Sequence, residues 1–176
     1  AFKKHVEAVN IGNGLDAGVN MGPLVADRRL DIMEGFVSNA VSEGAELIVG
    51  GERVQSAGSF YQPTLLANVP DSAQIMTEEP FGPIAPTATF ASLDEVIDRA
   101  NSLPFGLAAY AFTGSPKTAG VLKTEIESGM LAINSLHIHS VETPFGGLKN
   151  SGYGYEGGIE GLEAFLATKY SSEVYT

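Results

Sequence analysis

The sequence predicts an α/β protein in which a parallel-rich sheet is flanked by helices. Between residues 84 and 134, apolar strand-like segments alternate with helical segments. The links between these segments are short, which favours parallel pairing through right-handed crossovers. The strand segments are almost wholly apolar, as expected where helices cover both faces of a sheet.

The N-terminal part is predicted to hold two helices separated by a loop. Apolar side chains in residues 2–9 share one helix face, and the glycines of residues 10–25 predict a loop. Residues 27–43 place apolar side chains at helical spacing, and Gly44 suits the end of that helix. The side chains expected on its buried face are Leu30, Met33, Phe36, Val37, Ala40 and Val41.

Two extended segments are predicted after this helix. Residues 46–49 form a short strand that ends at Gly50 and Gly51. Residues 60–69 read as extended, although they contain Pro63. Because proline donates no ladder hydrogen bond, that strand is expected near an edge or a bulge.

A repeating strand–helix unit occupies the middle of the chain. Residues 84–90, 107–113 and 130–134 are strand-like. Residues 92–95 (Ser-Leu-Asp-Glu) form a capping box, in which the serine and glutamate side chains each satisfy a free backbone N–H. Residues 115–116 (Ser-Pro) are typical of the N-cap and first position of a second helix.

The C-terminal part follows a different pattern. Residues 146–158 are rich in glycine, and a short helix is expected over residues 159–165. Residues 166–176 alternate weakly and are predicted to be extended. An exposed terminal strand is an aggregation hazard unless it pairs, so pairing with another subunit is one remedy.

Composition limits the partners and the chemistry of the chain. Its 176 residues suit one domain, and 10 basic against 21 acidic residues give a formal net charge of −11. This acidic excess disfavours binding to nucleic acid or anionic membranes. No apolar run reaches the roughly 18 residues of a membrane span, and the first residues lack the apolar core of a signal peptide, so a cytoplasmic protein is expected. The absence of cysteine excludes thiol catalysis by this chain.

The first residues of the chain also indicate whether it belongs to a longer protein. There is no initiator methionine, and residues 2–9 begin as if in the middle of a helix. We therefore expect the chain to begin inside a larger protein. A processed N-terminus is the alternative.

Residues 78–83 (Glu-Glu-Pro-Phe-Gly-Pro) form the first candidate site. The prolines stiffen the backbone, and the glycine permits a turn or a close approach. A rigid carboxylate accepts hydrogen bonds from ribose hydroxyls, as acidic residues do in other dinucleotide sites, while an aromatic ring packs on the apolar face of the sugar. The alternative is a solvated turn with a core phenylalanine.

A second candidate is the glycine-rich stretch of residues 144–152 (Pro-Phe-Gly-Gly-Leu-Lys-Asn-Ser-Gly). Its spacing is wrong for a phosphate-binding P-loop. Residues 152–157 fit the G-x-G-x-x-G string, but they follow a loop and no downstream βαβ unit remains. A loop is therefore the better interpretation of both.

Residues 134–142 form the third candidate. His137 and His139 lie two apart, so an extended backbone would place them on one face. No third metal ligand accompanies them, so surface histidines are expected rather than a metal site. Ser140 and Thr143 offer hydroxyls near Phe145.

Five segments, taken together, resemble motifs of the NAD(P)-dependent aldehyde dehydrogenase superfamily. They are residues 21–24 (Met-Gly-Pro-Leu), 78–83, 101–107 (Asn-Ser-Leu-Pro-Phe-Gly-Leu), 128–134 (Ser-Gly-Met, then Asn134) and 144–152. They occur in family order and span nearly the whole chain.

The resemblance implies roles for particular residues. Glu79 matches the glutamate that hydrogen-bonds the nicotinamide ribose of NAD or NADP, and Phe81 matches the aromatic beside it. Phe145 matches an aromatic that lines the aldehyde entrance. Residues 1–163 would be the C-terminal portion of the catalytic domain. Residues 164–176 would be an oligomerisation tail that pairs with a neighbouring subunit of a homo-oligomer.

The chain departs from the family in one respect. Family members attack the aldehyde with a cysteine thiolate, the thiohemiacetal passes hydride to nicotinamide, and a glutamate activates water to hydrolyse the thioester. That cysteine, that glutamate and the cofactor-binding Rossmann domain lie before the region matching Ala1. We therefore expect a fragment of a longer enzyme, with no catalytic residue in this chain and no activity of its own.

The substrate class is suggested by residues 140–145 (Ser-Val-Glu-Thr-Pro-Phe). This stretch resembles succinate-semialdehyde dehydrogenases and relatives acting on other ω-carboxylated aldehydes, in which a serine matching Ser140 helps to hold the substrate carboxylate. A semialdehyde is therefore the expected substrate. Two alternatives stay open: a non-catalytic interaction module that reuses the fold, and a reductase of the glutamate-semialdehyde dehydrogenase type.

Overall fold

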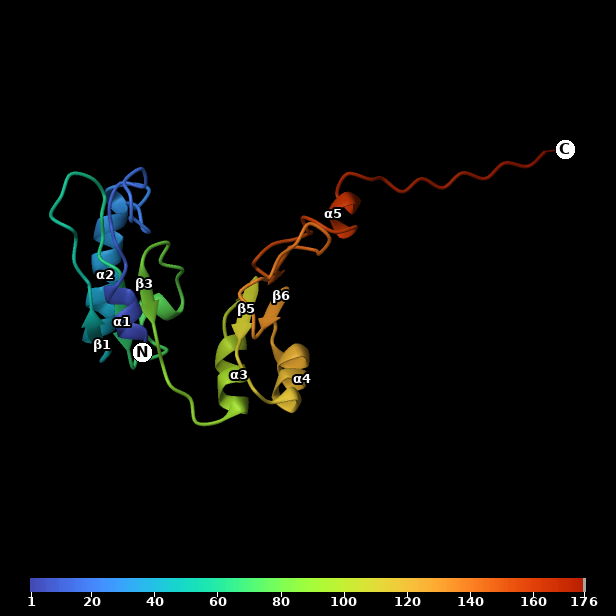
Figure 1. Ribbon diagram of the computed structural model, residues 1–176. Helices are drawn as coiled ribbons and strands as arrows, with labels where there is room; N and C mark the ends of the chain where they lie inside the picture. Colours follow the sequence, from blue (N-terminus) through green and yellow to red (C-terminus); the bar gives the residue numbers. More distant parts are fainter. Residues whose placement is uncertain (176) are drawn as a thin grey trace. The chain divides into compact units, whose positions relative to one another are not determined.

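The computed structural model describes residues 1–175 and divides into two compact units (Figure 1). Unit 1 comprises Ala1–Thr89, and unit 2 begins at Phe90. Each unit has its own sheet and helices. In the described residues no helix is long and apolar enough to cross a membrane.

Unit 1 is built on a three-stranded mixed sheet in the order β1-β2-β3. β1 runs antiparallel to β2, whereas β2 and β3 are parallel, with Leu65 opposite Ala85. The elements, in chain order, are α1 (Phe2–Glu7), α2 (Arg28–Ser42), β1 (Glu46–Val49), β2 (Thr64–Ala67), the 3₁₀ helix η1 (Gln74–Met76) and β3 (Ile84–Pro86).

Helix α2 supplies most of the core of unit 1, as its apolar spacing predicts. Five of the six side chains expected on its inner face are buried, but Val41 is 45 % exposed. Gly44 has a φ of 110°, a left-handed conformation that ends the helix at low steric cost. The core cluster consists of Leu30, Met33, Phe36, Val37, Ala40, Ala45, Tyr61, Leu66, Val69, Ala73, Ile75 and Ile84.

Strand β2 is shorter than the extended segment predicted over residues 60–69. Pro63 lies immediately before it, and Asn68 immediately after it adopts a φ of 53° that leaves the extended region. The expectation of an edge strand is wrong, because β2 is the central strand of its sheet; the pairing with β1 does carry a register irregularity between Leu47 and Val49, and Pro63 lies outside the paired residues. Gly50 packs so closely on Pro63 that a Cβ would lie 2.2 Å from the Pro63 carbonyl oxygen.

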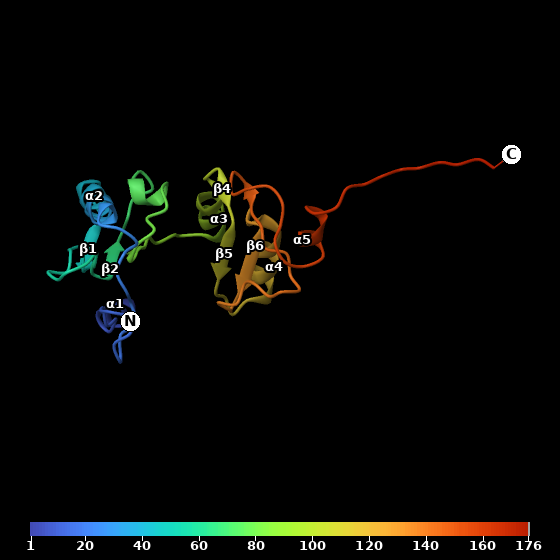
Figure 2. The same ribbon diagram turned by 90° about the horizontal axis from the view of Figure 1, so that it is seen from above.

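Unit 2 has a parallel strand pair, β5–β6, with Ala108 opposite Met130 and Ala111 opposite Ile133. Helix α4 connects these strands, and both α3 and α4 lie beside them (Figure 2). The elements are α3 (Leu93–Asn101), β4 (Phe105–Gly106), β5 (Ala108–Ala111), α4 (Pro116–Glu125), β6 (Met130–Ile133), β7 (Leu148–Lys149) and α5 (Glu160–Glu163).

Both helix starts predicted in this unit are confirmed. The Ser92 hydroxyl accepts from the Glu95 N–H at 3.1 Å, and the Ser115 hydroxyl accepts from the Thr118 N–H at 3.2 Å. The returning arm of the capping box differs from the expected pattern: the Glu95 carboxylate accepts from the N–H of Ala91, one residue before the cap, at 2.8 Å. The two local signals therefore set where α3 and α4 begin.

The predicted α/β class of the repeating unit is confirmed, but the pairing of one of its strands, β3, is corrected. Parallel pairing holds for β5 and β6, so the α/β fold class with parallel strands is confirmed. β3, however, ends at Pro86 rather than at Phe90, and it pairs with β2. Both the backbone N–H and the hydroxyl of Thr87 then donate to the Leu66 carbonyl, which completes this pairing.

The tail does not form a strand in the part of the chain that the structure describes. Helix α5 spans only Glu160–Glu163, and residues 166–175 carry no strand assignment. The tail leads away from α5 (Figure 1), and its apolar side chains are exposed, including Tyr170 at 86 % and Tyr175 at 87 %. Thr176 lies outside the described residues.

Candidate functional site

Residues 78–83 form an exposed loop between η1 and β3. Glu78 and Glu79 are adjacent but have different surroundings. Gln74 donates from Nε2 to the Glu78 carboxylate at 3.0 Å. Glu79 is exposed, and within residues 1–175 its carboxylate has no recorded hydrogen bond or ion pair. Its full accepting capacity is therefore available to a ligand.

Phe81 is displayed by this loop rather than buried. Its side chain is 71 % exposed, which excludes the alternative of a core phenylalanine. Its φ is 44°, a left-handed conformation that is uncommon for a residue with a bulky side chain. Such a conformation costs about 1 kcal/mol or more and persists only where neighbouring contacts hold it.

Helix α2 provides those contacts. A guanidinium N–H of Arg29 donates to the carbonyl oxygen of Pro80. Gly82 lies directly on Met33, and a Cβ at Gly82 would be 2.2 Å from the Met33 sulfur. Met33 is fully buried, so it offers little room to move. Two residues one turn apart on α2 thus fix the loop on both sides of Phe81.

A pocket of about 380 Å³ opens beside the loop. This volume is at the small end for ligand sites and suits part of a larger molecule. The residues that line it are Arg29, Ile32, Gly35, Phe36, Gln74, Glu78 and Glu79.

In unit 2, the glycine-rich stretch of residues 144–152 packs on residues 101–107. β4 and β7 pair antiparallel, with Phe105 opposite Lys149. The Lys149 ammonium donates to the carbonyls of Asn101 at 2.8 Å and Leu103 at 3.1 Å, and it pairs with Glu127 at 2.5 Å. The N–H of Gly106 donates to the Ser151 hydroxyl at 2.9 Å. The loop interpretation holds for residues 152–157, whereas Leu148–Lys149 in the glycine-rich stretch form the short strand β7, and two segments about 45 residues apart form one anchored structure.

Backbone contact between glycines brings the start of β6 against the same stretch. A Cβ at Gly129 would lie 1.9 Å from the Gly146 carbonyl oxygen, and one at Gly147 would lie 2.4 Å from the Ser151 Cβ. No other residue fits these positions without moving backbone. This close packing explains the need for glycine in both segments.

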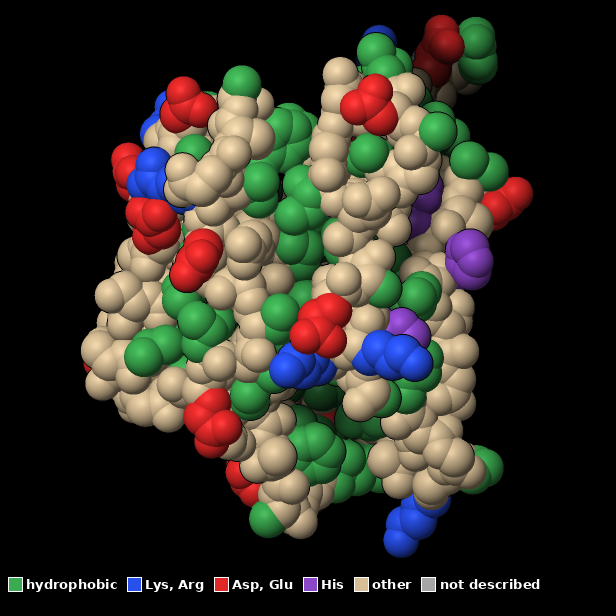
Figure 3. Space-filling view, turned by 60° about the vertical axis from the view of Figure 1, so that its left-hand side comes forward, with side chains coloured by type: hydrophobic (Ala, Val, Ile, Leu, Met, Phe, Trp, Pro, Cys, Tyr) green, Lys and Arg blue, Asp and Glu red, His purple; other side chains and the backbone are tan. Residues whose placement is uncertain are grey.

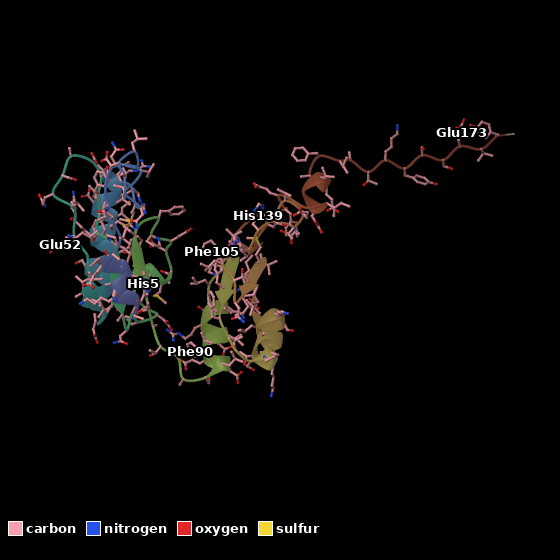
Figure 4. All side chains as sticks on the ribbon, in the orientation of Figure 1. His5, Glu52, Phe90, Phe105, His139 and Glu173 are labelled. Carbon is pink, nitrogen blue, oxygen red and sulfur yellow. The ribbon has the colours of Figure 1, made fainter. Side chains whose placement is uncertain are left out.

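Phe145 sits in this stretch, half-buried, with His139 against it. The two rings meet edge to face, with centroids 5.4 Å apart and an interplanar angle of 85°. The backbone of Phe145 exchanges hydrogen bonds with Glu156 at 2.7 and 2.8 Å. His139, labelled in Figure 4, lies in the segment after β6 and is exposed.

Ser140 and Thr143 close a small turn before Phe145. The Ser140 N–H donates to the Thr143 hydroxyl at 3.0 Å, and that hydroxyl donates to the Ser140 carbonyl at 3.1 Å. A hydrogen bond from the Ser140 side chain holds the pKa of the Glu142 carboxyl below its usual value. The Ser140 hydroxyl itself lies 3.4 Å from the Thr143 hydroxyl.

The prediction of surface histidines is confirmed. His137 and His139 are both exposed, and histidine side chains are visible at the surface in Figure 3. Among residues 1–175, no group of three or more His, Cys, Asp or Glu side chains is placed to hold a metal ion. The acidic side chains in Figure 3 are spread over the visible face rather than gathered in one patch.

A separate polar cluster joins α2 to the loop after β1. The Arg53 guanidinium contacts Glu34 at 2.6 Å and Asp31 at 2.5 Å, and its hydrogen bond lowers the pKa of the Glu34 carboxyl. Nearby Tyr61 is 1 % exposed, and burial raises its pKa to about 12. Its phenol oxygen is one of the buried side-chain atoms without a hydrogen-bond partner in the described chain. Glu52, labelled in Figure 4, lies on the same loop.

The four site residues expected from the sequence fall in two groups. Glu79 and Phe81 belong to unit 1, and Ser140 and Phe145 belong to unit 2. Sequence reasoning missed Arg29, which contacts the loop at Pro80, 51 positions away. The one sequence signal for this contact is that Arg29 is a basic residue next to the apolar face of α2.

Comparison with known proteins identifies the family. The aldehyde dehydrogenase family matches residues 1–171. A putative 4-(hydroxymethyl)benzenesulfonate dehydrogenase of Comamonas testosteroni is 44 % identical over 97 % of this chain and 35 % of its own length. The mitochondrial succinate-semialdehyde dehydrogenase of Rattus norvegicus is 40 % identical over 97 % of this chain and 32 % of its own length.

Solved structures agree with this result. The aldehyde dehydrogenase of Brucella melitensis biovar abortus 2308 superposes with a TM-score of 0.92 at 38 % identity, over 98 % of this chain and 35 % of that one. Betaine aldehyde dehydrogenase of Staphylococcus aureus, solved in complex with NAD⁺, gives a TM-score of 0.88 at 34 % identity, over 94 % of this chain and 34 % of that one.

The chain belongs to the aldehyde dehydrogenase family, as the five sequence motifs predict. It spans about a third of the length of the relatives it matches. Succinate-semialdehyde dehydrogenases are among those relatives, so the predicted resemblance to them is confirmed.

Proposed function

We propose that this chain forms the C-terminal portion of the catalytic domain of an NAD(P)-dependent aldehyde dehydrogenase, and that it contributes the ribose-binding loop of that enzyme. The observation that carries the proposal is the pair Glu79 and Phe81. One has a carboxylate with no recorded partner in the described chain, and the other an exposed ring on a strained backbone. Strain at an exposed aromatic is typical of a ligand site.

The residues present fit a dinucleotide. The Glu79 carboxylate would accept hydrogen bonds from the nicotinamide ribose, and the Phe81 ring would pack beside it. NAD or NADP bound there supplies a hydride acceptor. This chain positions that acceptor but has no cysteine, so the nucleophile must come from outside it. The chain alone is therefore expected to have no dehydrogenase activity.

The test uses the full-length protein that carries this chain. Glu79→Gln should weaken NADH or NADPH binding by about tenfold or more, because hydrogen bonds to charged groups contribute roughly 1.5–3 kcal/mol. Phe81→Ala should also weaken binding, because the ring no longer buries apolar surface against the ribose. Glu52→Gln, an exposed carboxylate far along the sequence, is the matched control. If both site variants bind the cofactor as the control does, the proposal is wrong. The same result would favour a non-catalytic module.

For the substrate, we propose an aldehyde with an anionic group, with succinate semialdehyde as the candidate. Ser140 is exposed, and its hydroxyl, 3.4 Å from that of Thr143, can donate to an anionic group of a ligand. Phe145 would line the apolar part of the entrance. The two relatives described above are named for substrates that carry a carboxylate or a sulfonate, which supports this substrate class.

Ser140→Ala tests the substrate proposal. In the full-length protein the KM for succinate semialdehyde should rise by about tenfold or more, the value of one hydrogen bond to an anion. The KM for butyraldehyde, which has the same chain length and no charge, should change little. An equal change for both aldehydes would refute the assignment of Ser140.

We further propose that residues 164–176 are an oligomerisation tail, with residues 1–163 belonging to the catalytic domain. Exposed apolar side chains support this, among them Leu166 at 74 % and Val174 at 83 %. Such a segment is a ready template for strand pairing. Deleting residues 164–176 should lower the mass of the full-length assembly measured by light scattering. An unchanged mass would rule out this role.

A further inference from the structure

We propose that Arg29 is a positioning residue that sets cofactor affinity through the Pro80 carbonyl, without contacting the cofactor's reacting atoms. This inference rests on the proposed function of Glu79 and Phe81. It adds a residue from another element, helix α2, to the machinery of that loop.

The first step is the hydrogen bond itself. An Arg29 guanidinium N–H donates to the carbonyl oxygen of Pro80, which lies between Glu79 and Phe81. That carbonyl belongs to the same planar peptide unit as the N–H of Phe81. Fixing the oxygen therefore fixes the plane from which the φ of Phe81, 44°, is measured.

The second step is the stiffness of the loop on either side. The ring of Pro80 restricts its own φ, so the orientation of its carbonyl depends chiefly on its ψ, which the hydrogen bond from Arg29 holds. On the far side, Gly82 lies against the buried Met33, where even a methyl group would not fit. Arg29 and Met33 thus hold the loop from two points on one helix face, and Phe81 is strained between them.

The third step is that Arg29 has no competing partner among residues 1–175. Its Nε atom is buried and lacks a hydrogen-bond acceptor there. It forms no ion pair with Glu78 or Glu79, although all three residues line the same pocket. The Pro80 carbonyl therefore compensates a partly buried guanidinium group that has no other acceptor in the described residues.

Lysine would not reproduce this arrangement fully. An ammonium group is a compact charge on a flexible stem, whereas the guanidinium group presents donors in a rigid plane. Arg29→Lys should keep some of the contact, and Arg29→Met should keep the length and packing of the stem without any donor. Arg28, the preceding residue on α2, is exposed, and its side chain makes no hydrogen bond or ion pair with the residues that the structure describes, so Arg28→Met is the matched control.

The experiment measures NADH or NADPH affinity, aldehyde KM and thermal stability of the full-length protein for these variants. Arg29→Met should raise the cofactor dissociation constant by about tenfold, since one charge-assisted hydrogen bond contributes roughly that factor. The aldehyde KM and the melting temperature should stay close to those of Arg28→Met. Arg29→Lys should recover part of the lost affinity.

A double-mutant cycle with Glu79→Gln links the two sites. If Arg29 acts through the loop, the effects of Arg29→Met and Glu79→Gln on cofactor affinity should be less than additive. Additive effects would overturn the proposal. So would a loss of affinity that scales with a loss of melting temperature across the Arg29 variants, because the arginine would then stabilise the fold as a whole.

The outcomes also separate this inference from the function on which it rests. If Glu79→Gln weakens cofactor binding and Arg29→Met behaves like the Arg28→Met control, only the role of Arg29 is refuted. If Glu79→Gln and Phe81→Ala have no effect on cofactor binding, the proposed function itself fails.

Discussion

Replacing Gly129 by alanine tests whether glycine packing holds together the part of unit 2 that is proposed to bind substrate. The added Cβ would lie 1.9 Å from the Gly146 carbonyl oxygen and 2.8 Å from the Gly147 Cα. All of these neighbours are backbone atoms, so no side chain can rotate away. The start of β6 and the stretch before β7 would have to separate by about 1 Å to restore ordinary contact.

The expected cost is large for a single methyl group. Overpacking a well-ordered interior typically costs about 1–3 kcal/mol, and a clash between two backbones should reach the top of that range. Gly120→Ala is the matched control, because Gly120 lies within α4 with nothing within 4 Å of an added Cβ. There the same substitution should stabilise the protein by about 0.5–1 kcal/mol, the helix preference of alanine over glycine.

The assay is urea unfolding of the full-length protein, followed by far-UV circular dichroism, together with the KM for the aldehyde. Gly129→Ala should lower the unfolding midpoint and raise the aldehyde KM, since Phe145 precedes the displaced carbonyl. Gly120→Ala should raise the midpoint slightly and leave the KM unchanged. Equal midpoints for the two variants would refute the packing argument, because only Gly129→Ala places its methyl group against backbone atoms.

Three further predictions concern unit 1. Gly82→Ala would set a Cβ 2.2 Å from the buried Met33 sulfur, so it should cost about 1–3 kcal/mol in urea unfolding and weaken cofactor binding; unchanged values in both would contradict the packing described. Tyr61→Phe removes a buried hydroxyl without a recorded partner and should stabilise the protein by up to about 1 kcal/mol at pH 7. Because burial raises the pKa of Tyr61 from 10.0 to about 12, wild-type stability should fall as pH rises through that interval, and the fall should be absent in the variant. Since Arg53 lowers the pKa of Glu34, that carboxylate contributes stability above its usual pKa of 4.5, and this contribution is lost as pH falls through the lowered value. Glu34→Gln should therefore shift the urea midpoint at pH 7 and have little effect in strong acid; equal shifts at both pH values would exclude the ion pair as the cause.

The parts of the fold that the sequence predicts are those specified locally. Ser92 and Ser115 mark the starts of α3 and α4 because a capping hydroxyl bonds to a backbone N–H three positions on. The apolar spacing of residues 27–43 predicts α2 because one face must meet the core. Neither feature depends on a distant partner.

The missed features depend on contacts between distant segments. β3 was expected to pair with the later strands, yet it pairs with β2. The prediction failed because the sequence of a short apolar strand does not indicate which strand it pairs with. The pairing of β4 with β7 involves two residues on each side, too few to leave a periodic pattern. Phe81 at positive φ is equally unpredictable, since phenylalanine has no preference for that region.

The candidate site shows the same division. Glu79 and Phe81 were found from a contiguous motif of residues 78–83, and their exposure agrees with a binding role. Arg29 was missed because its partner lies 51 positions away, and an arginine beside the buried face of a helix has many uses. A contiguous motif identifies side chains that meet a ligand, but not the element that supports them.

Arg29 and Met33 lie one turn apart on the same face of α2, and both contact the loop of residues 78–83. The position of that loop therefore depends on the position of α2. A slight rotation or slide of α2 would tilt the ring of Phe81 even if every residue of the loop stayed the same. In a random-mutagenesis library selected for altered cofactor affinity, substitutions on the face of α2 that carries Arg29 and Met33 should therefore be recovered. Nothing about their position in the sequence would connect them to a nucleotide.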